Sequence, residues 1–213
     1  MSNGWIIKVT GLVQGVGFRP TAWQIARSLG LKGRVRNTSA GVTIELACSD
    51  IERDHFLTEL RAGLPKLARI DDVEIEPCRF ASAPASFTIE ESVTGKTSAS
   101  IVADAMICEA CHKEILDPAN RRYRYAFANC THCGPRLTIV RKIPYDRKNT
   151  AMAAFPMCAD CRAENENPAD RRFHAEPIAC AACGPKLALE IAEGIKMPDP
   201  DPLEAAALLL LAG

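Results

Sequence analysis

Several features that mark large classes of protein are absent from this chain of 213 residues. Its 26 basic and 26 acidic side chains cancel, which argues against a polybasic protein that coats nucleic acid or a membrane surface. The longest apolar run, 205–212, is far shorter than the roughly 20 residues that span a bilayer. No basic segment followed by a long apolar one begins the chain, so we expect no signal peptide and a cytoplasmic protein.

Cysteine is abundant, since the chain has ten. Eight of them form four Cys-x-x-Cys pairs, separated by gaps of 18, 24 and 18 residues: Cys108/Cys111, Cys130/Cys133, Cys158/Cys161 and Cys180/Cys183. Without an export signal, metal ligation is favoured over disulfide bonds. Two successive pairs have the spacing of a closed four-thiolate zinc site, which predicts two structural zinc ions per chain.

Other readings of the cysteines stay open. Redox pairs or an iron–sulfur cluster are the alternatives, although a duplicated and evenly spaced set favours zinc. His112, His132 and His174 lie close to the cysteines and could replace a thiol, but four thiols are already supplied per copy. Cys48 and Cys78 are expected to pack as small apolar residues. The pairs could combine within a copy or between copies, and pairing within a copy is favoured because each copy then closes independently.

The cysteine region is an internal duplication with a period of 50 residues. At this shift Arg121-Arg122 falls on Arg171-Arg172, and Gly134-Pro135 falls on Gly184-Pro185. Residues 108–185 carry 12 basic and 9 acidic side chains, a charge that two four-thiolate zinc sites would bring to about −1. We therefore expect no nucleic-acid partner.

Composition divides the chain into four parts. A first domain is expected over 1–91, a small polar linker over 92–104, and the finger domain over 105–190 with copies at about 108–133 and 158–183. Residues 191–213 resemble a linker and the start of a truncated further domain. The oligomeric state is not predicted.

The first domain is expected to have the element order βαββαβ. Segments with many β-branched residues, or with alternating apolar and polar residues, predict strands near 5–10, 32–37, 42–47, 72–77 and 86–90. Apolar residues at helical spacing predict two helices, from about Pro20 to Gly30 and from Ser49 to Gly63, the second opened by a Ser-x-x-Glu capping box with Glu52. This order predicts an α+β fold, a ferredoxin-like α/β sandwich, followed by the duplicated four-cysteine finger domain.

A glycine-rich loop over 11–19 joins the first expected strand to the first helix. Its glycines let backbone N–H groups turn towards an anion, and the helix places its positive end there. Arg19 adds a planar fork for phosphate oxygens. The first 44 residues have six basic and no acidic side chains, which would attract an anionic substrate. The predicted phosphate-binding residues are Gln14, Gly15, Val16, Gly17, Phe18 and Arg19.

Two better-known phosphate loops do not fit. Glu90 stands where a Walker A loop ending in Gly95-Lys96-Thr97 needs its first glycine, and Pro20 ends the match to the dinucleotide fingerprint. A tight turn with incidental glycines is the remaining alternative.

Together with residues 33–42, the loop closely resembles the two signature segments of the acylphosphatases, over roughly 4–91. The resemblance implies that Arg19 binds the phosphoryl oxygens and that Asn37 holds the attacking water. Acyl phosphates have a good leaving group, so positioning a water in line and neutralising the oxygens suffices. The alternatives are a surface salt bridge for Arg19 and a turn role for Asn37.

The whole chain resembles the front part of the HypF family, the carbamoyltransferases of [NiFe]-hydrogenase maturation. The repeated Pro-Ala-x-Arg-Arg and Cys-x-x-Cys-Gly-Pro elements carry this resemblance. It implies hydrolysis of carbamoyl phosphate to carbamate and phosphate. ATP-dependent transfer to a HypE cysteine, for cyanide-ligand synthesis, would follow in domains that this chain lacks. The alternatives are a stand-alone acylphosphatase whose fingers recruit a macromolecule, and a non-catalytic module that binds carbamoyl phosphate on a zinc scaffold.

Overall fold

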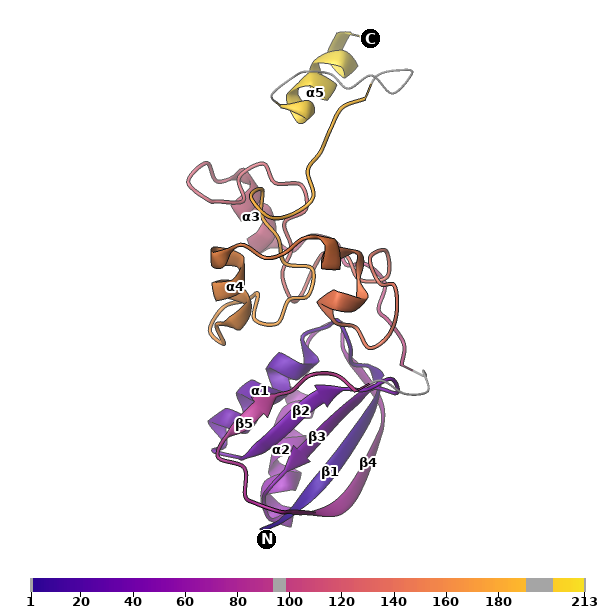
Figure 1. Ribbon diagram of the computed structural model, residues 1–213, viewed down its shortest axis with the longest axis vertical. Coiled ribbons are helices and arrows are strands. Elements are labelled where there is room, and N and C mark those ends of the chain that lie inside the picture. Colours follow the sequence, from indigo (N-terminus) through magenta and orange to yellow (C-terminus); the bar gives the residue numbers. More distant parts are fainter. Residues whose placement is uncertain (1, 94–98, 191–200, 213) are drawn as a thin grey trace.

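The computed structural model describes residues 2–93, 99–190 and 201–212. An α/β part and the cysteine-rich part are stacked end to end, with the N-terminus at one end and helix α5 (Pro202–Ala212) at the other (Figure 1). The expected linkers fall partly on residues 94–98 and 191–200, which lie outside the described residues. In the part of the chain that is described, no helix is long and apolar enough to cross a membrane.

Five strands form one sheet in the order β4-β1-β3-β2-β5. The strands are β1 (Ser2–Leu12), β2 (Gly33–Asn37), β3 (Val42–Leu46), β4 (Arg69–Phe80) and β5 (Phe87–Ile89). The first four pair in antiparallel fashion, and β5 runs parallel to β2 at the edge. The ferredoxin-like order expected from the sequence is confirmed. β4 is longer than expected because it follows β1 along its whole length, with a bulge between Thr10 and Gly11.

Helices α1 (Phe18–Ser28) and α2 (Asp50–Ala62) cover one face of this sheet (Figure 1). The apolar positions of the helices and of alternate strand residues meet there and form the core, in which Ile44, Ala22 and Phe56 are fully buried. The expected end of α1 and the expected start of α2 are confirmed, whereas α1 begins at Phe18, before the expected Pro20. α1 stops before Gly30, whose φ of 67° suits glycine, and α2 begins with the Ser49–Glu52 capping box.

The opposite face of the sheet is polar, and it corrects the electrostatic expectation. Arg36 pairs with Glu45 at 2.9 Å, and Lys8 pairs with Glu76 at 2.7 Å. Arg34 also pairs with Glu45. Much of the early basic excess is therefore neutralised on this face by acids from later in the sequence, and does not gather at the glycine-rich loop.

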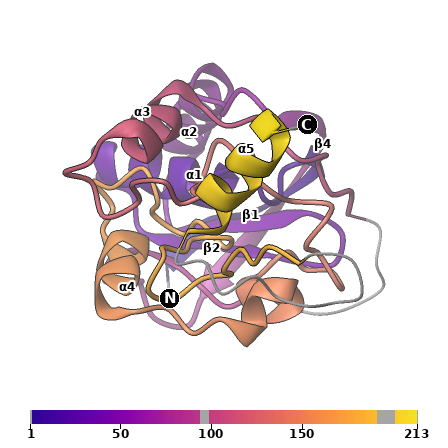
Figure 2. The same ribbon diagram turned by 90° about the horizontal axis from the view of Figure 1, so that it is seen from above.

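The cysteine-rich part has little regular structure. Its helices α3 (Glu109–Leu116) and α4 (Ala159–Glu166) each begin directly after the first cysteine of a copy, at the expected offset of 50 residues. Two short 3₁₀ turns, η1 (Arg147–Asn149) and η2 (Ala151–Ala154), lie between the copies. Viewed along the long axis, this part lies over the loop end of the sheet (Figure 2). Its small apolar clusters are built largely around the cysteines themselves.

The capping box gives a test of the α/β part. Replacing Ser49 by Ala removes the acceptor for the Glu52 backbone N–H and should lower the free energy of unfolding by about 1 kcal/mol. Urea denaturation measures the change. Ser82→Ala, the same exchange in an exposed loop, is the control and should leave the transition unchanged. An equal effect of the two exchanges would contradict a capping role.

Candidate active site and metal centres

The glycine-rich loop is packed directly against the cysteine-rich part. Gly15 and Gly17 have φ values of 70° and 82°, a left-handed backbone that glycine adopts without strain. A Cβ atom at Gly15 would lie 3.1 Å from the Arg136 side chain and 3.2 Å from the Tyr145 ring. Gly17 is also the N-cap of α1, so the positive end of the helix is directed at the loop.

Gln14 fixes the loop to the turn between β2 and β3 and to the finger region through three hydrogen bonds. Its Nε2 donates to the carbonyls of Thr38 (2.7 Å) and Gly41 (2.8 Å), in the turn between β2 and β3. Its Oε1 accepts the backbone N–H of Tyr145 at 2.9 Å. Of the remaining loop residues, Val16 and Phe18 are buried in the core. The loop is thus held between the sheet and the finger region.

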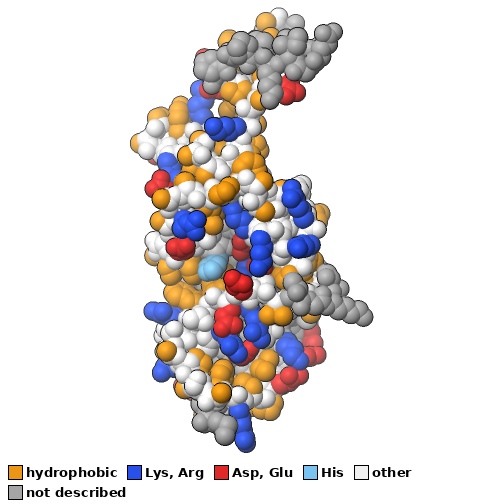
Figure 3. All heavy atoms as spheres, in the orientation of Figure 1, with side chains coloured by type: hydrophobic (Ala, Val, Ile, Leu, Met, Phe, Trp, Pro, Cys, Tyr) orange, Lys and Arg blue, Asp and Glu red, His pale blue; other side chains and the backbone are white. Residues whose placement is uncertain are grey.

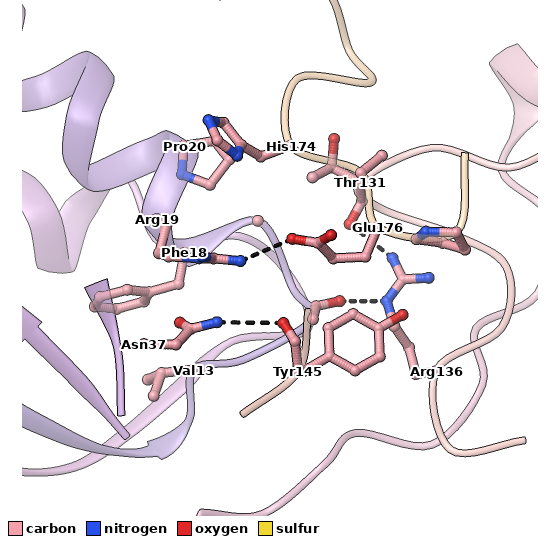
Figure 4. Close-up of a pocket in the computed structure, with 14 residues that line it drawn as sticks. Val13, Phe18, Arg19, Pro20, Asn37, Thr131, Arg136, Tyr145, His174 and Glu176 are labelled. Atoms are coloured by element: carbon pink, nitrogen blue, oxygen red, sulfur yellow. Dashed lines mark hydrogen bonds and ion pairs between the residues drawn. The ribbon is translucent and has the colours of Figure 1, made fainter. Parts of the chain in front are cut away.

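Arg19 leaves the first turn of α1 and points at the finger region (Figure 4). Its Nη2 lies 2.8 Å from Glu176 Oε1 and 3.2 Å from Asp146 Oδ1. The Arg19 side chain is 10% exposed, so these are shielded ion pairs rather than the surface salt bridge considered above. The hydrogen bond to Glu176 uses Nη2 alone, which leaves other donors of the guanidinium for an anion.

Asn37 is the last residue of β2, and it lines the same cavity as Arg19. It is 1% exposed, and its Nδ2 donates to the Tyr145 carbonyl at 3.3 Å. Its Oδ1 is buried and has no hydrogen-bond partner among the described residues. Leaving such an acceptor unsatisfied costs about 1–3 kcal/mol, so this oxygen marks a place for a ligand or a water. The cavity of about 20 Å³ beside it has room for a water.

The other wall of the cavity comes from the finger region, which sequence reasoning did not connect with the loop. These lining residues are Thr131, Arg136, Tyr145, His174, Ala175, Glu176 and Pro177. The sequence alone suggests His174 only as a spare metal ligand, and it gives no signal that the other six residues belong to the site. A contact between residues more than 100 positions apart leaves no local pattern to read. On the face seen in Figure 3, acidic and basic side chains and a histidine gather where the two parts meet.

Arg136 links the loop to the first four-cysteine copy. It is 1% exposed, its Nε donates to the Gly15 carbonyl, and its Nη2 donates to the Thr131 carbonyl at 2.9 Å. Its Nη1 donates to the Cys133 carbonyl, also at 2.9 Å. No described carboxylate forms an ion pair with it. A buried guanidinium held by carbonyls alone keeps its charge uncompensated, which favours an anion in the adjoining cavity.

Burial perturbs two titratable groups near Arg19, namely Glu176 and His174. Burial raises the pKa of Glu176, although Arg19 opposes this shift. Burial, with a further contribution from Arg19, lowers the pKa of His174 to about 4, so its imidazole is neutral at pH 7. The site therefore contains two carboxylates and a neutral histidine beside its guanidinium groups.

The eight paired cysteines form two four-cysteine clusters, one within each copy. The first contains Cys108, Cys111, Cys130 and Cys133, and the second contains Cys158, Cys161, Cys180 and Cys183. Neighbouring sulfur atoms lie 3.5–3.8 Å apart in the first cluster and 3.6–3.8 Å apart in the second. Four thiolates at 2.3 Å from a tetrahedral zinc ion would lie about 3.8 Å apart. The clusters therefore suit zinc, and pairing within copies is confirmed.

The other candidate ligands lie elsewhere. Neither four-cysteine cluster includes a histidine among the described residues, and His112 and His132 are exposed. Cys48 packs against the core of the α/β part, where burial raises the pKa of its thiol to about 11. Cys78 is half-buried on β4. Both cysteines are free, and Cys48 packs as a small apolar residue, as expected.

Each copy supplies an arginine to the thiols of the other copy. Arg121 Nη2 lies 3.0 Å from Cys161 Sγ, and Arg171 Nη1 lies 3.0 Å from Cys111 Sγ. These positions are equivalent under the 50-residue shift, so the contacts are reciprocal. Donors of this kind around ligating thiolates offset their negative charge and orient them.

The neighbouring arginines form crossed ion pairs. Arg122 is buried and pairs with Glu164 of the second copy, and Arg172 pairs with Glu114 of the first. Burial would raise the pKa of Glu164, but hydrogen bonds from Arg122 and Arg121 lower it to about 2. The stabilisation of the fold by the ionised Glu164 carboxylate is thus present above the usual carboxyl pKa of about 4.3, and it is lost as the pH falls towards 2.

Comparisons with known proteins match both parts of the chain. The acylphosphatase family matches residues 5–89, and the HypF finger matches residues 107–140 and 157–190. Carbamoyltransferase HypF2 of Cupriavidus necator is 51% identical over 209 residues, 97% of this chain and 26% of that protein. An acylphosphatase of Lactobacillus johnsonii is 39% identical over 71 residues, 33% of this chain and 78% of that protein.

A solved structure has the same arrangement. Full-length HypF in the phosphate- and nucleotide-bound form is 38% identical, with a TM-score of 0.90 that covers 100% of this chain and 28% of that one. The chain spans about a fifth to a quarter of the length of the curated HypF relatives it matches, between 19% and 26%.

The crossed ion pairs can be tested with one substitution. Glu164→Gln leaves the buried charge of Arg122 without its carboxylate. It should lower the free energy of unfolding by about 2–3 kcal/mol, less than the roughly 3–5 kcal/mol of a fully buried pair because Glu164 is partly exposed. Denaturant titration followed by circular dichroism measures this. Glu166→Gln, an exposed position on the same helix, serves as the control. Similar midpoints for both variants would show that the crossed pair contributes little.

Proposed function

This chain belongs to the HypF family, and from that membership we propose that its α/β part hydrolyses carbamoyl phosphate to carbamate and phosphate. The observation that carries the proposal is the meeting of three features on one cavity. They are the glycine-rich loop at the positive end of α1, the guanidinium of Arg19, and the unpartnered Oδ1 of Asn37.

The loop and Arg19 would bind the phosphoryl group in a wider form of the cavity, since a volume of about 20 Å³ has room for a water and not for carbamoyl phosphate. Backbone N–H groups at Gly15 and Gly17 have the local conformation that suits an anion, and the helix dipole adds to them. Arg19 would donate to the phosphoryl oxygens through N–H groups that Glu176 does not use. The uncompensated charge of Arg136 favours the same anion.

Asn37 would position the attacking water through its Oδ1, while its Nδ2 stays on the Tyr145 carbonyl. The water oxygen bonds to phosphorus as the P–O bond to the carbamoyl group breaks. The electron pair of that bond leaves with carbamate, and the water protons pass to solvent and to the phosphate. Carbamate is a good leaving group, so orientation and charge neutralisation carry the reaction.

We also propose that the two four-cysteine clusters hold one structural zinc ion each. Every ligand position would be filled by a thiolate, which leaves no open position for chemistry. Bound zinc would supply folding free energy that the small apolar clusters of this part cannot provide. The zinc-bound copies would then hold Arg136, Tyr145 and Glu176 against the loop.

The chain covers between 19% and 26% of its curated HypF relatives, and we propose that the later steps of the family use segments outside these 213 residues. We propose that the longer protein uses ATP to activate the carbamoyl group and passes it to a cysteine of a HypE-type partner, for cyanide-ligand synthesis. We therefore expect these 213 residues alone to hydrolyse carbamoyl phosphate, whereas carbamoyl transfer would need those further segments. A module that binds carbamoyl phosphate without turnover remains the competing function, because Arg19 is already ion-paired.

Phosphate release from carbamoyl phosphate tests the proposal. Arg19→Ala should lower kcat/KM by about 100-fold or more, because the guanidinium that stabilises the phosphoryl charge is lost. Arg27→Ala is the matched control, since Arg27 is exposed on the same helix. Equal rates for wild type and Arg19→Ala would refute the assignment. Saturable binding of carbamoyl phosphate without release of phosphate would favour the binding module.

Metal content tests the second proposal. Purified protein should contain about two zinc ions per chain, and Cys161→Ser should retain about one and unfold at lower temperature. Cys78→Ser, which changes a cysteine outside both clusters, should keep both ions. Atomic emission and thermal denaturation provide the readouts. Iron or a metal-free protein of full stability would overturn the zinc assignment.

A further inference from the structure

A carboxylate stands where an anionic substrate would bind. Glu176 lines the cavity from the finger region, and its Oε1 lies 2.8 Å from Arg19 Nη2 (Figure 4). In the proposed reaction this carboxylate would repel a phosphate dianion. A repulsive charge in a binding site needs a compensating contact with some other part of the ligand.

Arg147 holds Glu176 in place through two hydrogen bonds. Its Oε2 accepts the backbone N–H of Arg147 at 2.9 Å, and its own carbonyl accepts Arg147 Nη1 at 2.7 Å. These bonds orient Oε1 towards Arg19 and the cavity. The carboxylate is therefore a fixed acceptor, and a carboxylate oxygen can accept more than one hydrogen bond.

The finger fold itself does not require this glutamate. Under the 50-residue shift Glu176 falls on Ala126, while the cysteines and paired arginines that build both copies are the same in each. The acid is present where a copy faces the glycine-rich loop and absent at the equivalent position of the other copy. This placement points to a role in the site.

Carbamoyl phosphate differs from most acyl phosphates in carrying an NH₂ group on its carbonyl carbon. We propose that Glu176 is a specificity-determining residue whose carboxylate accepts a hydrogen bond from this NH₂ group while Arg19 and the loop bind the phosphoryl end. The inference rests on the proposed function and deepens it. Asn37 Oδ1 remains free for water, because the NH₂ group is bound by a different acceptor.

The same contact would reject acyl phosphates that lack an N–H donor. Acetyl phosphate would place a methyl group against a shielded carboxylate, which would lose hydration and gain no hydrogen bond. With acetyl phosphate, the repulsion between the Glu176 carboxylate and the phosphoryl group would have no hydrogen bond to offset it. Sites built to bond an N–H or O–H group discriminate strongly against analogues without it.

The experiment compares two substrates on the full chain of 213 residues. We measure kcat/KM for carbamoyl phosphate and acetyl phosphate by phosphate release, and take the ratio. Wild type should prefer carbamoyl phosphate by at least about 10-fold. Glu176→Leu, of similar size but without an acceptor, should lower the ratio by about 10-fold or more, and Glu176→Gln, which keeps an acceptor oxygen, should restore part of it.

Glu109→Gln is the control, since this glutamate is exposed on α3 and should leave the ratio unchanged. Zinc content and circular dichroism verify that the variants fold. A wild-type ratio near one overturns the inference and needs no variant. So does an unchanged ratio in Glu176→Leu, since a residue that merely closes the site would alter both substrates equally. In either case hydrolysis that depends on Arg19 leaves the proposed function standing, whereas no hydrolysis of either substrate overturns both.

Discussion

The reciprocal contacts between the two finger copies are the constraint on which the rest of the structure depends. Each copy is too small to have an apolar core of its own, and its cysteines account for much of what is buried. Arg121 and Arg171 reach the thiols of the opposite copy, and the buried Arg122 finds its carboxylate there as well. Neither copy can therefore adopt this arrangement alone, and the pair presents a single surface to the α/β part.

That single surface changes what the glycine-rich loop can do. The loop of an isolated α/β domain would face water, whereas here Tyr145, Arg136 and Glu176 cover it. The small cavity admits little water, so the charged side chains that line it interact more strongly than they would in solvent. Arg136 also connects the glycine-rich loop directly to the first four-cysteine cluster. It bonds the carbonyls beside the first four-cysteine cluster and the carbonyl of Gly15 with one guanidinium.

Local features were predictable from the sequence, and contacts between distant segments were not. The capping box at Ser49, the end of α1 before Gly30 and the clustering of the cysteines follow from short-range patterns, and the structure confirms them. Of the residues predicted for the phosphate site, Gly15, Gly17, Phe18, Arg19 and Asn37 line one cavity, whereas Gln14 and Val16 do not. The roles of all of them remain predictions. The ion pairs of Arg34 and Arg36 with Glu45 and the finger wall of the site depend on tertiary packing that periodicity does not encode.

The duplication shows which finger residues both copies share and which only one copy contributes to that wall. Positions that are the same in both copies build the fingers, namely the cysteines, the paired arginines and the Glu114/Glu164 pair. The residues of the two matched finger segments that line the cavity differ from their equivalents in the other copy: Thr131/Ala181, Arg136/Lys186, His174/Arg124, Ala175/Tyr125, Glu176/Ala126 and Pro177/Phe127. Folding constrains both copies alike, whereas a site formed with one external loop constrains each copy differently. Identity between the copies thus marks the residues that both fingers need, whereas a difference alone does not mark the site, because most equivalent positions of the two copies differ.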